Sequence, residues 1–191
     1  RGPTGAPMSL RESAISLLTD WQSPDPDQDA LRHAVLAFLH SRPDSCERAC
    51  AAGHITASTL VVDATAEKVL LTLHPRFGRW LQLGGHCEAT DVDILAAALR
   101  EATEESGIED LRLDPTLAAI HVHPVICSLG VPTRHLDLQF IATAAADAEI
   151  AISAESLDLR WWPIGDLPEG TDAGLVRLVD AVRGNPQASL E

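Results

Sequence analysis

The sequence of 191 residues lacks any apolar run of the roughly 18 residues that would cross a membrane. Its first residues, RGPTGAPM, also lack the basic-then-apolar pattern of a secretory signal, which makes the cytoplasm the expected location. A GxxxxGK(S/T) loop, a GxGxxG fingerprint and a nucleophile-elbow serine are all missing. These absences argue against P-loop nucleotide hydrolases, dinucleotide-binding enzymes and serine hydrolases of the elbow type.

Cysteine is scarce, with four residues in the chain. Cys46 and Cys50 are four positions apart, but no second pair supplies the spacing of a zinc ribbon. We therefore predict free thiols, as is usual in a reducing compartment.

Positive charge is also in short supply, because 14 basic residues face 28 acidic ones and the formal net charge is −14. Such a field repels polyanions, so duplex nucleic acid is not an expected partner. An anionic substrate would need a bound cation to reverse the local sign of its site. The acidity is thus a mild argument for a metal, although a surface kept soluble by its charge explains it equally well.

The hydrophobic pattern predicts strands interleaved with single helices, preceded by a helical pair. Residues 9–40 repeat apolar side chains at helical spacing, with the breaker SPDPDQD between two helices. Strand-like runs follow at 55–63, 68–73 and 80–83, and a helix is expected over 93–106. Further strand-like runs lie at 117–123, 125–129, 136–143 and 159–163, and a last helix is expected over 173–183. This order predicts an α/β sandwich. We expect a tail or expression remnant at residues 1–8, an N-terminal helical extension at 9–45, and the main domain at 46–191.

The helix expected at 93–106, DILAAALREATEES, gathers three carboxylates near its C-terminal end. Asp93 is a fair N-cap, and Gly107 suits the left-handed position after the helix. Glu101 and Glu105 are neighbours at i, i+4, with Glu104 beside them, and like charges at this spacing repel. The negative end of the helix dipole disfavours them further. A divalent cation would reverse both effects, whereas a solvated acidic face is the alternative explanation of the same pattern.

The stretch GGHCEATDVDILAAALREATEESGI resembles the Nudix box. The box reads Gly, five residues, Glu, seven residues, then Arg-Glu-hydrophobe-x-Glu-Glu-x-Gly-hydrophobe. Gly85 fits its first glycine, and seven positions fit its second half: Arg100, Glu101, Ala102, Glu104, Glu105, Gly107 and Ile108. Asp91 stands for the first glutamate, and eight residues rather than seven separate it from Arg100. The supporting role of Asp91 is therefore open, with Glu88 and Asp93 as substitutes.

Two further segments agree with the Nudix resemblance. A Trp precedes the glycines in FGRWLQLGGH, although Leu83 stands where a Pro is usual, and RWWPIGDLP matches the aromatic strand and Leu-Pro turn of the family. The resemblance extends from about Thr56 to the C-terminus. It implies an α/β/α sandwich with a mixed sheet for the domain at 46–191, here with the N-terminal helical extension.

The resemblance also implies residue roles. Glu101, Glu104 and Glu105 are the expected ligands of Mg²⁺ or Mn²⁺, with the carbonyl of Gly85 as a further ligand. Arg100 would orient the glutamates, by pairing with Glu104. The expected catalytic residues are Glu101, Glu104, Arg100 and Glu155. Members of the family use as general base either the equivalent of Glu101 or a glutamate of a later loop; here Glu155 is preferred, with Glu149 as its competitor. The expected substrate contacts are His86 and Arg79.

The implied activity is hydrolysis of a phosphoanhydride in a nucleoside diphosphate linked to another moiety, or in a related nucleotide. Isopentenyl-diphosphate isomerases are similar in fold and also have a Gly-His after the strand that contains the Trp. Their catalytic cysteine precedes that Gly-His, whereas this chain has Gly84 at that position and Cys87 after the Gly-His. A non-catalytic Nudix module that binds a ligand is the third alternative.

His121 and His123 share one face of a strand and could bind metal or substrate, or simply be hydrogen-bonded. Dimers are common in the family, so a homodimer is also expected.

Overall fold

The computed structural model describes residues 8–23, 25–127 and 130–184. The predicted tail at residues 1–8 therefore lies outside the described residues, except for Met8. The helices are α1 (Leu10–Asp20), α2 (Pro26–Ser41), α3 (Ile94–Ser106) and α4 (Ala173–Gly184). The strands are β1 (His54–Val62), β2 (Lys68–His74), β3 (Arg79–Leu81), β4 (Leu83–His86), β5 (Arg112–Leu113), β6 (Ala119–Ile126), β7 (Pro132–Thr143) and β8 (Asp158–Pro163).

The strands form one mixed sheet around β1. β1 pairs with β7 in parallel and with β2 and β4 in antiparallel orientation. β6 and β5 extend the sheet from β7, while β3 and β8 extend it from β2. All nine residues of β1 are buried, which means that both faces of the sheet are covered at its centre.

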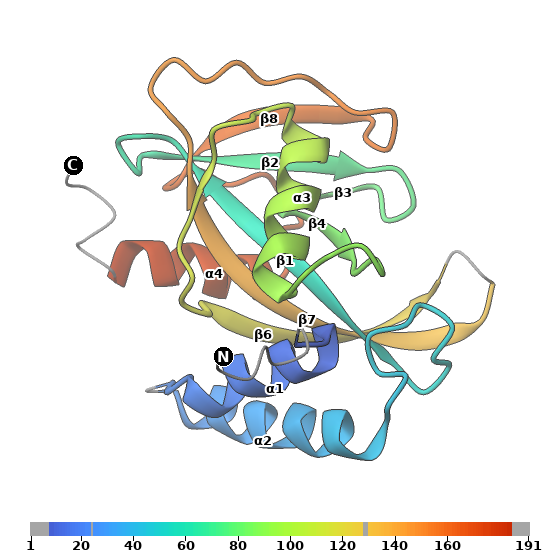
Figure 1. The fold of residues 1–191 in the computed structure, drawn as a ribbon. Helices are drawn as coiled ribbons and strands as arrows, with labels where there is room; N and C mark the ends of the chain where they lie inside the picture. The colour runs from blue at the N-terminus through green and yellow to red at the C-terminus, as the bar shows by residue number, and fades with distance from the viewer. Residues whose placement is uncertain (1–7, 24, 128–129, 185–191) are drawn as a thin grey trace, which may run out of the picture.

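Helices cover the two faces (Figure 1). On one face, α3 buries Ala102 against Val61 and Leu70, and Thr59 Oγ1 donates a hydrogen bond of 3.2 Å to the carbonyl of Ala98. On the other face, α4 packs Leu175 and its apolar neighbours against the opposite side chains of β1 and β2. The predicted α/β/α sandwich with a mixed sheet and an N-terminal helical part is confirmed.

The N-terminal helices share the core of the sheet. Ala14, Leu18, Val35 and Leu39 are at most 1% exposed and belong to one apolar cluster with residues of β1, α3, β6 and β7. Gln28 on α2 joins the edge of β6, where its amide nitrogen donates to the carbonyl of Ile120 and its amide oxygen accepts from the N–H of Ile120, at 3.0 and 2.7 Å. The boundary at residue 45 stays a prediction.

The strands differ from the predicted runs in several places, because β5 was not predicted and β7 begins at Pro132 rather than at 136. The runs expected at 117–123 and 125–129 form the single strand β6, which continues through Pro124, while residues 128 and 129 lie outside the described part. The N–H of Ile120 points to the outer edge of the sheet, where Gln28 accepts it, and backbone N–H groups alternate in direction along a strand. The N–H at position 124, four residues further on, would also point outward, so proline there loses no hydrogen bond to β7. The run expected at 80–83 is divided at Gln82 into β3 and β4.

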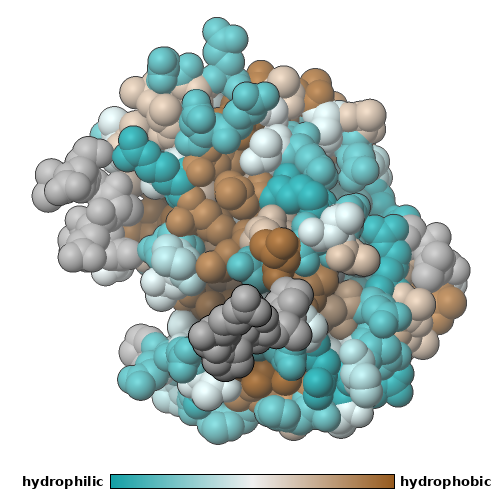
Figure 2. Space-filling model, in the orientation of Figure 1, coloured by the Kyte–Doolittle hydropathy of each residue, from teal (hydrophilic) through white to brown (hydrophobic). Residues whose placement is uncertain are grey.

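Hydrophilic residues surround the face of the molecule that Figure 2 shows, while hydrophobic residues gather near its middle. No helix in the described ranges is long and apolar enough to span a membrane.

Candidate active site

Helix α3 places the three box glutamates, and its ends are fixed by the two residues that the sequence predicted. The Asp93 side chain accepts a hydrogen bond of 2.7 Å from the N–H of Ala96, as an N-cap does. Gly107 ends the helix with φ at 72°, and a Cβ there would lie 2.6 Å from that of Ala151. Both the N-cap and the left-handed glycine are confirmed.

Glu105 is the most buried of the three glutamates, with 8% of its surface exposed. Its Oε2 accepts a hydrogen bond of 2.9 Å from the N–H of Gly84, which ties the helix to β4. Burial raises the pKa of Glu105 to about 7 even though the Gly84 N–H opposes the shift, and the charges of Glu101 and Glu155 raise it further. The carboxylate form of Glu105 is therefore costly without a nearby cation.

Glu101 lies directly against Gly85. A Cβ on Gly85 would lie 2.7 Å from Glu101 Oε2, so any larger residue would displace the carboxylate. Burial raises the pKa of Glu101, although the Arg100 guanidinium opposes that shift. The glycine of the box thus provides space for a carboxylate on the facing helix.

Arg100 connects the parts of the site. Its Nε and Nη2 donate to the two carboxylate oxygens of Asp91 at 2.8 and 2.9 Å, which is a bidentate pair. Nη2 also donates to the carbonyl of His86 at 3.0 Å, and Nη1 donates to Glu101 Oε1 at 3.1 Å and Glu104 Oε2 at 3.2 Å. The expected pair with Glu104 is present, and Arg100 also contacts Glu101, Asp91 and β4.

Asp91, whose role the sequence left open, is the main partner of Arg100. Its side chain is 4% exposed and accepts a further hydrogen bond of 2.7 Å from the N–H of Glu88. Burial alone would raise the pKa of Asp91, but the hydrogen bonds from Arg100 and Glu88 bring it below the usual value. The side chain of Asp93 caps the helix and that of Glu88 is exposed, so neither substitutes for Asp91.

Glu155 lies on the loop between β7 and β8, exposed to solvent. Its negative charge is one of the lesser causes that raise the pKa of Glu101 and Glu105, after burial. The loop is tied to the end of α3 by a hydrogen bond of 2.7 Å from the Ala151 N–H to the Ser106 carbonyl. Its role as general base stays a prediction.

His86 points away from the glutamates. Side chains alternate along a strand, and because the Cβ direction of Gly85 leads to Glu101, that of His86 leads to the other face of the sheet. There Nδ1 lies 3.0 Å from Arg48 Nη2, and Nε2 lies 3.4 Å from Cys127 Sγ. The contact of His86 with substrate stays a prediction, and its ring lies beside Arg48 and Cys127 rather than beside the box glutamates.

The sequence did not predict that His54, His86, Cys127 and His135 lie together. One ligand atom from each lies within 4.8 Å of the others. Burial lowers the pKa of His86 to about 4 and that of His135 to about 3, so both rings are neutral near pH 7. His121 and His123 do share a face, with ring centroids 5.0 Å apart, and the His123 ring lies 5.2 Å from that of His135 without belonging to the group.

A row of buried polar residues lies on the same sheet face and was also not predicted. Asp137 accepts hydrogen bonds from Thr56 at 2.9 Å, Ser58 at 2.6 Å and Gln139 at 3.1 Å. All four side chains belong to residues that are at most 4% exposed. The signal available in the sequence was the alternation of polar residues in β1 and β7. In an outer strand the same alternation would indicate a face exposed to solvent.

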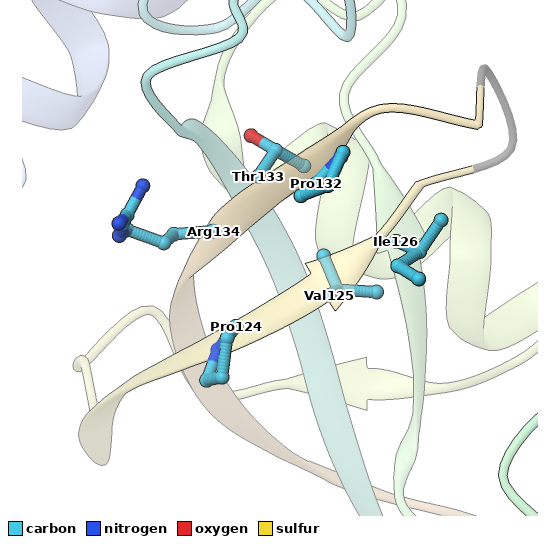
Figure 3. A pocket seen from close by; sticks show the side chains of 6 residues that line it. All are labelled: Pro124, Val125, Ile126, Pro132, Thr133 and Arg134. Carbon is cyan, nitrogen blue, oxygen red and sulfur yellow. The ribbon is translucent and has the colours of Figure 1, made fainter.

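Two further features are Arg79 and a hollow at the hairpin between β6 and β7. Arg79 is exposed on β3, and its charge is one of the lesser causes that lower the pKa of His123. A hollow of about 380 Å³ lies at the β6–β7 hairpin (Figure 3) and is lined by Pro124, Val125, Ile126, Pro132, Thr133 and Arg134. None of the box residues lines this hollow.

Comparison with known proteins agrees with the site. The family model described as NUDIX domain matches residues 53–181. A NUDIX-family hydrolase from Clostridium perfringens is 28% identical, with a TM-score of 0.52 over 68% of this chain and 96% of that one. None of the curated proteins compared with the chain matched it.

Two more distant structures support the fold alone. An Ap4A hydrolase of C. elegans, solved as a binary complex, is 19% identical, with a TM-score of 0.54 over 68% of this chain and 95% of that one. A UDP-X diphosphatase is 18% identical, with a TM-score of 0.53 over 92% of this chain and 91% of that one. So large a share of this chain includes N-terminal residues before the family match.

The chain belongs to the Nudix family. The prediction that it is an enzyme of the pyrophosphohydrolase class is confirmed by the family match together with the hydrolase neighbours.

Proposed function

We propose that the protein hydrolyses a phosphoanhydride bond in a nucleoside diphosphate linked to another moiety, with Mg²⁺ or Mn²⁺ as its cofactor. The observation that carries the proposal is how the box glutamates are held: Glu101 lies against Gly85, and Glu105 accepts a hydrogen bond from Gly84. Arg100 joins Glu101 to Glu104. The substrate class is that of the UDP-X diphosphatase whose fold matches most of the chain. A homodimer and a cytoplasmic location stay predictions.

The residues of the box fit a divalent cation. Two carboxylates with raised pKa values lie within reach of a third that is largely exposed, and oxygen is the ligand type that Mg²⁺ prefers. Glu101, Glu104 and Glu105 would hold the ion, with the Gly85 carbonyl as a further ligand. When bound, such an ion neutralises phosphate oxygens and lowers the pKa of a coordinated water.

The protein's own groups have separate tasks in this proposal. Gly84 fixes Glu105 through its N–H, and Arg100 fixes Glu101 and Glu104 through its Nη1. Glu155, whose charge acts on the buried glutamates from a solvent-exposed loop, accepts the proton of the attacking water. A negative substrate approaches a strongly acidic protein only where the cation reverses the local field.

The role of Glu155 predicts the effect of Glu155→Gln. The rate should fall by roughly 10²–10³-fold, because a positioned general base contributes on this order. The fall is measured as kcat/KM at saturating Mg²⁺. Glu149→Gln is the matched control and should keep wild-type kinetics. Loss of activity in Glu149→Gln together with normal turnover in Glu155→Gln would show that Glu149, and not Glu155, is the base.

The direct test of the function is a substrate panel. Nucleoside triphosphates, dinucleoside polyphosphates and nucleoside diphosphate sugars are incubated with Mg²⁺, with Mn²⁺ or with chelator, and ¹⁸O-water identifies the bond that is cut. We expect metal-dependent release of a nucleoside monophosphate from the diphosphate conjugates. Isomerisation of isopentenyl diphosphate, or binding without turnover, would contradict the proposal. Cys87 is the cysteine closest in sequence to the position that the isomerase nucleophile would take. It is buried in the core, and burial raises the pKa of its thiol.

A further inference from the structure

A second group of potential metal ligands lies on the opposite face of the sheet from the box glutamates. His54 begins β1, His86 ends β4, His135 lies on β7 and Cys127 follows β6. Their ligand atoms all lie within 4.8 Å of one another, and Cys127 Sγ is 3.4 Å from His86 Nε2. His54 and Cys127 are buried, and the other two are partly buried.

Strand register brings the three rings together. His54 is paired with His135 across the parallel β1–β7 ladder, and His86 is paired with Thr56, two residues along β1 from His54. Paired residues and residues two apart share one face of a sheet. The ring centroids accordingly lie 4.9 to 5.1 Å apart in all three combinations. The backbone of the sheet thus fixes three of the four side chains before any ligand is present.

The ring nitrogens are arranged as they are in metal sites. His54 Nδ1 lies 3.4 Å from the carbonyl of Cys50, which can only accept, so Nδ1 carries the proton and Nε2 carries the lone pair. A second ring nitrogen that donates to a carbonyl is typical of histidines that bind a metal. The Nε2 atoms of His54 and His135 are buried without a hydrogen-bond partner. Leaving such an atom unsatisfied costs about 1–3 kcal/mol, which an ion bound to it would remove.

We propose that His54, His86, His135 and Cys127 bind one Zn²⁺ ion. Three imidazole nitrogens and a thiolate are a preferred ligand set of zinc, and bond lengths of about 2.0–2.3 Å place tetrahedral ligand atoms roughly 3.3–3.8 Å apart. The cluster is close to that spacing. Cys127 releases its proton to solvent as the ion binds. Four protein ligands leave no open position, so this zinc is structural and separate from the oxygen-liganded box.

Arg48 is the residue that zinc binding must displace. Its Nη2 lies 3.0 Å from His86 Nδ1. When Nε2 of a neutral ring binds a metal, Nδ1 carries the proton and cannot accept a hydrogen bond. Arg48 is exposed to solvent. Arg48→Met should therefore tighten zinc binding, because it removes both a competing contact and a positive charge near the ion.

The zinc site would stabilise the strand that carries the active-site glycines. His86 follows Gly85 directly, and Gly84 donates the hydrogen bond that fixes Glu105. An ion on His86 would anchor β4 to β7 and to the end of β6 in addition to its backbone pairing with β1. The positions of Gly84 and Gly85 relative to α3 would then depend on this site.

The test measures metal binding, not turnover. The protein of 191 residues is stripped with chelator and titrated with Co²⁺, and the Co²⁺ is then displaced by Zn²⁺ in the presence of a chromophoric chelator. We expect one tightly bound equivalent that gives a thiolate-to-cobalt charge-transfer band and strong tetrahedral d–d bands, whereas Co²⁺ bound by the oxygen ligands of the box gives neither. Cys127→Ser should lose the charge-transfer band and bind Zn²⁺ roughly 100-fold more weakly, since even hydrogen-bonding partners of metal ligands contribute about 10–100-fold. His135→Gln should also bind weakly.

Matched controls separate this site from the box and from other cysteines. Cys46→Ser and Glu105→Gln should keep the band and the affinity of the wild type, and circular dichroism checks the fold of every variant. The proposal is overturned if the wild type gives no charge-transfer band, if Cys127→Ser keeps it, or if Glu105→Gln abolishes it. Because Cys127→Ser exchanges one atom, it keeps the test decisive if His135→Gln fails to fold. The result is independent of whether the proposed hydrolysis is found.

Discussion

Glu105→Gln is expected to remove hydrolysis and at the same time to stabilise the metal-free protein above pH 7. Activity should fall by at least roughly 10²–10³-fold, the size seen when one charge-stabilising group is taken from an active site. The fold should survive, because the amide oxygen of Gln can still accept the hydrogen bond that Gly84 donates to Glu105. The variant thus tests a metal-ligand role and the buried charge together.

The stability gain follows from the raised pKa of Glu105. Its value is about 7 in the folded protein against 4.5 for an unperturbed group, so folding favours the protonated form. Glu105 therefore contributes stability below about pH 4.5, and this contribution is lost as the pH rises through about 7. Gln never ionises, so above pH 7 it should raise the free energy of unfolding by about 1–3 kcal/mol.

Urea unfolding of metal-free wild type and Glu105→Gln at pH 4 and pH 8 measures the effect. The two curves should separate at pH 8 and approach each other at pH 4. Glu104→Gln is the control, because the Glu104 side chain is 61% exposed and should give no pH-dependent gain. Retained Mg²⁺-dependent turnover in Glu105→Gln would contradict the role of Glu105 as a metal ligand. If the free energies of unfolding of wild type and variant differed by the same amount at pH 4 and pH 8, the raised pKa of Glu105 would be contradicted.

Arg100→Met is expected to be the most destabilising change in the site. It would leave Asp91, with 4% of its side chain exposed, without its bidentate partner. Removing one member of a buried ion pair costs about 3–5 kcal/mol, most of it from the charge that is left behind. The contacts of Arg100 with Glu101, Glu104 and the His86 carbonyl would be lost too, so kcat should fall even where the fold persists.

A double-mutant cycle with Asp91→Asn measures this coupling. Adding Asp91→Asn to Arg100→Met should recover part of the lost free energy of unfolding, because the stranded charge is gone. Arg183→Met breaks an exposed pair with Asp180 at 3.6 Å and an exposed hydrogen bond of 2.6 Å to the Ile164 carbonyl, and should change stability by only about 1 kcal/mol. Equal, small effects of Arg100→Met and Arg183→Met would show that Asp91 is solvated without Arg100.

The sequence was sufficient to predict the box helix, because its signals are local. Its apolar stripe, the Asp93 cap and the Gly107 end all depend on residues within a few turns. The sandwich was predictable from the same periodicity together with the family resemblance. The extra residue before Arg100 made Asp91 ambiguous, since only the path of the loop decides whether its carboxylate reaches the guanidinium.

The histidine and cysteine group could not be predicted, because it depends on how distant strands are paired. His54, His86 and His135 are separated by 32 and 49 positions in the sequence, and a shift of one residue in either ladder would turn one ring to the other face. β5 was missed for a related reason: two residues carry too little pattern to predict a strand. Pro124 likewise suggested a break, and only the position of β6 at the edge explains its presence in a strand.

The contact between Gln28 and Ile120 has a consequence for how the chain avoids self-association. A strand edge with free N–H and carbonyl groups is a template on which another chain can pair and aggregate. One amide side chain occupies both groups of Ile120, and the helix that carries it covers this stretch of the β6 edge. A shortened chain that kept only the family-matched residues 53–181 would expose that edge together with the apolar surface beneath α1 and α2. The N-terminal helices thus protect the sheet against misassembly, although no box residue lies in them.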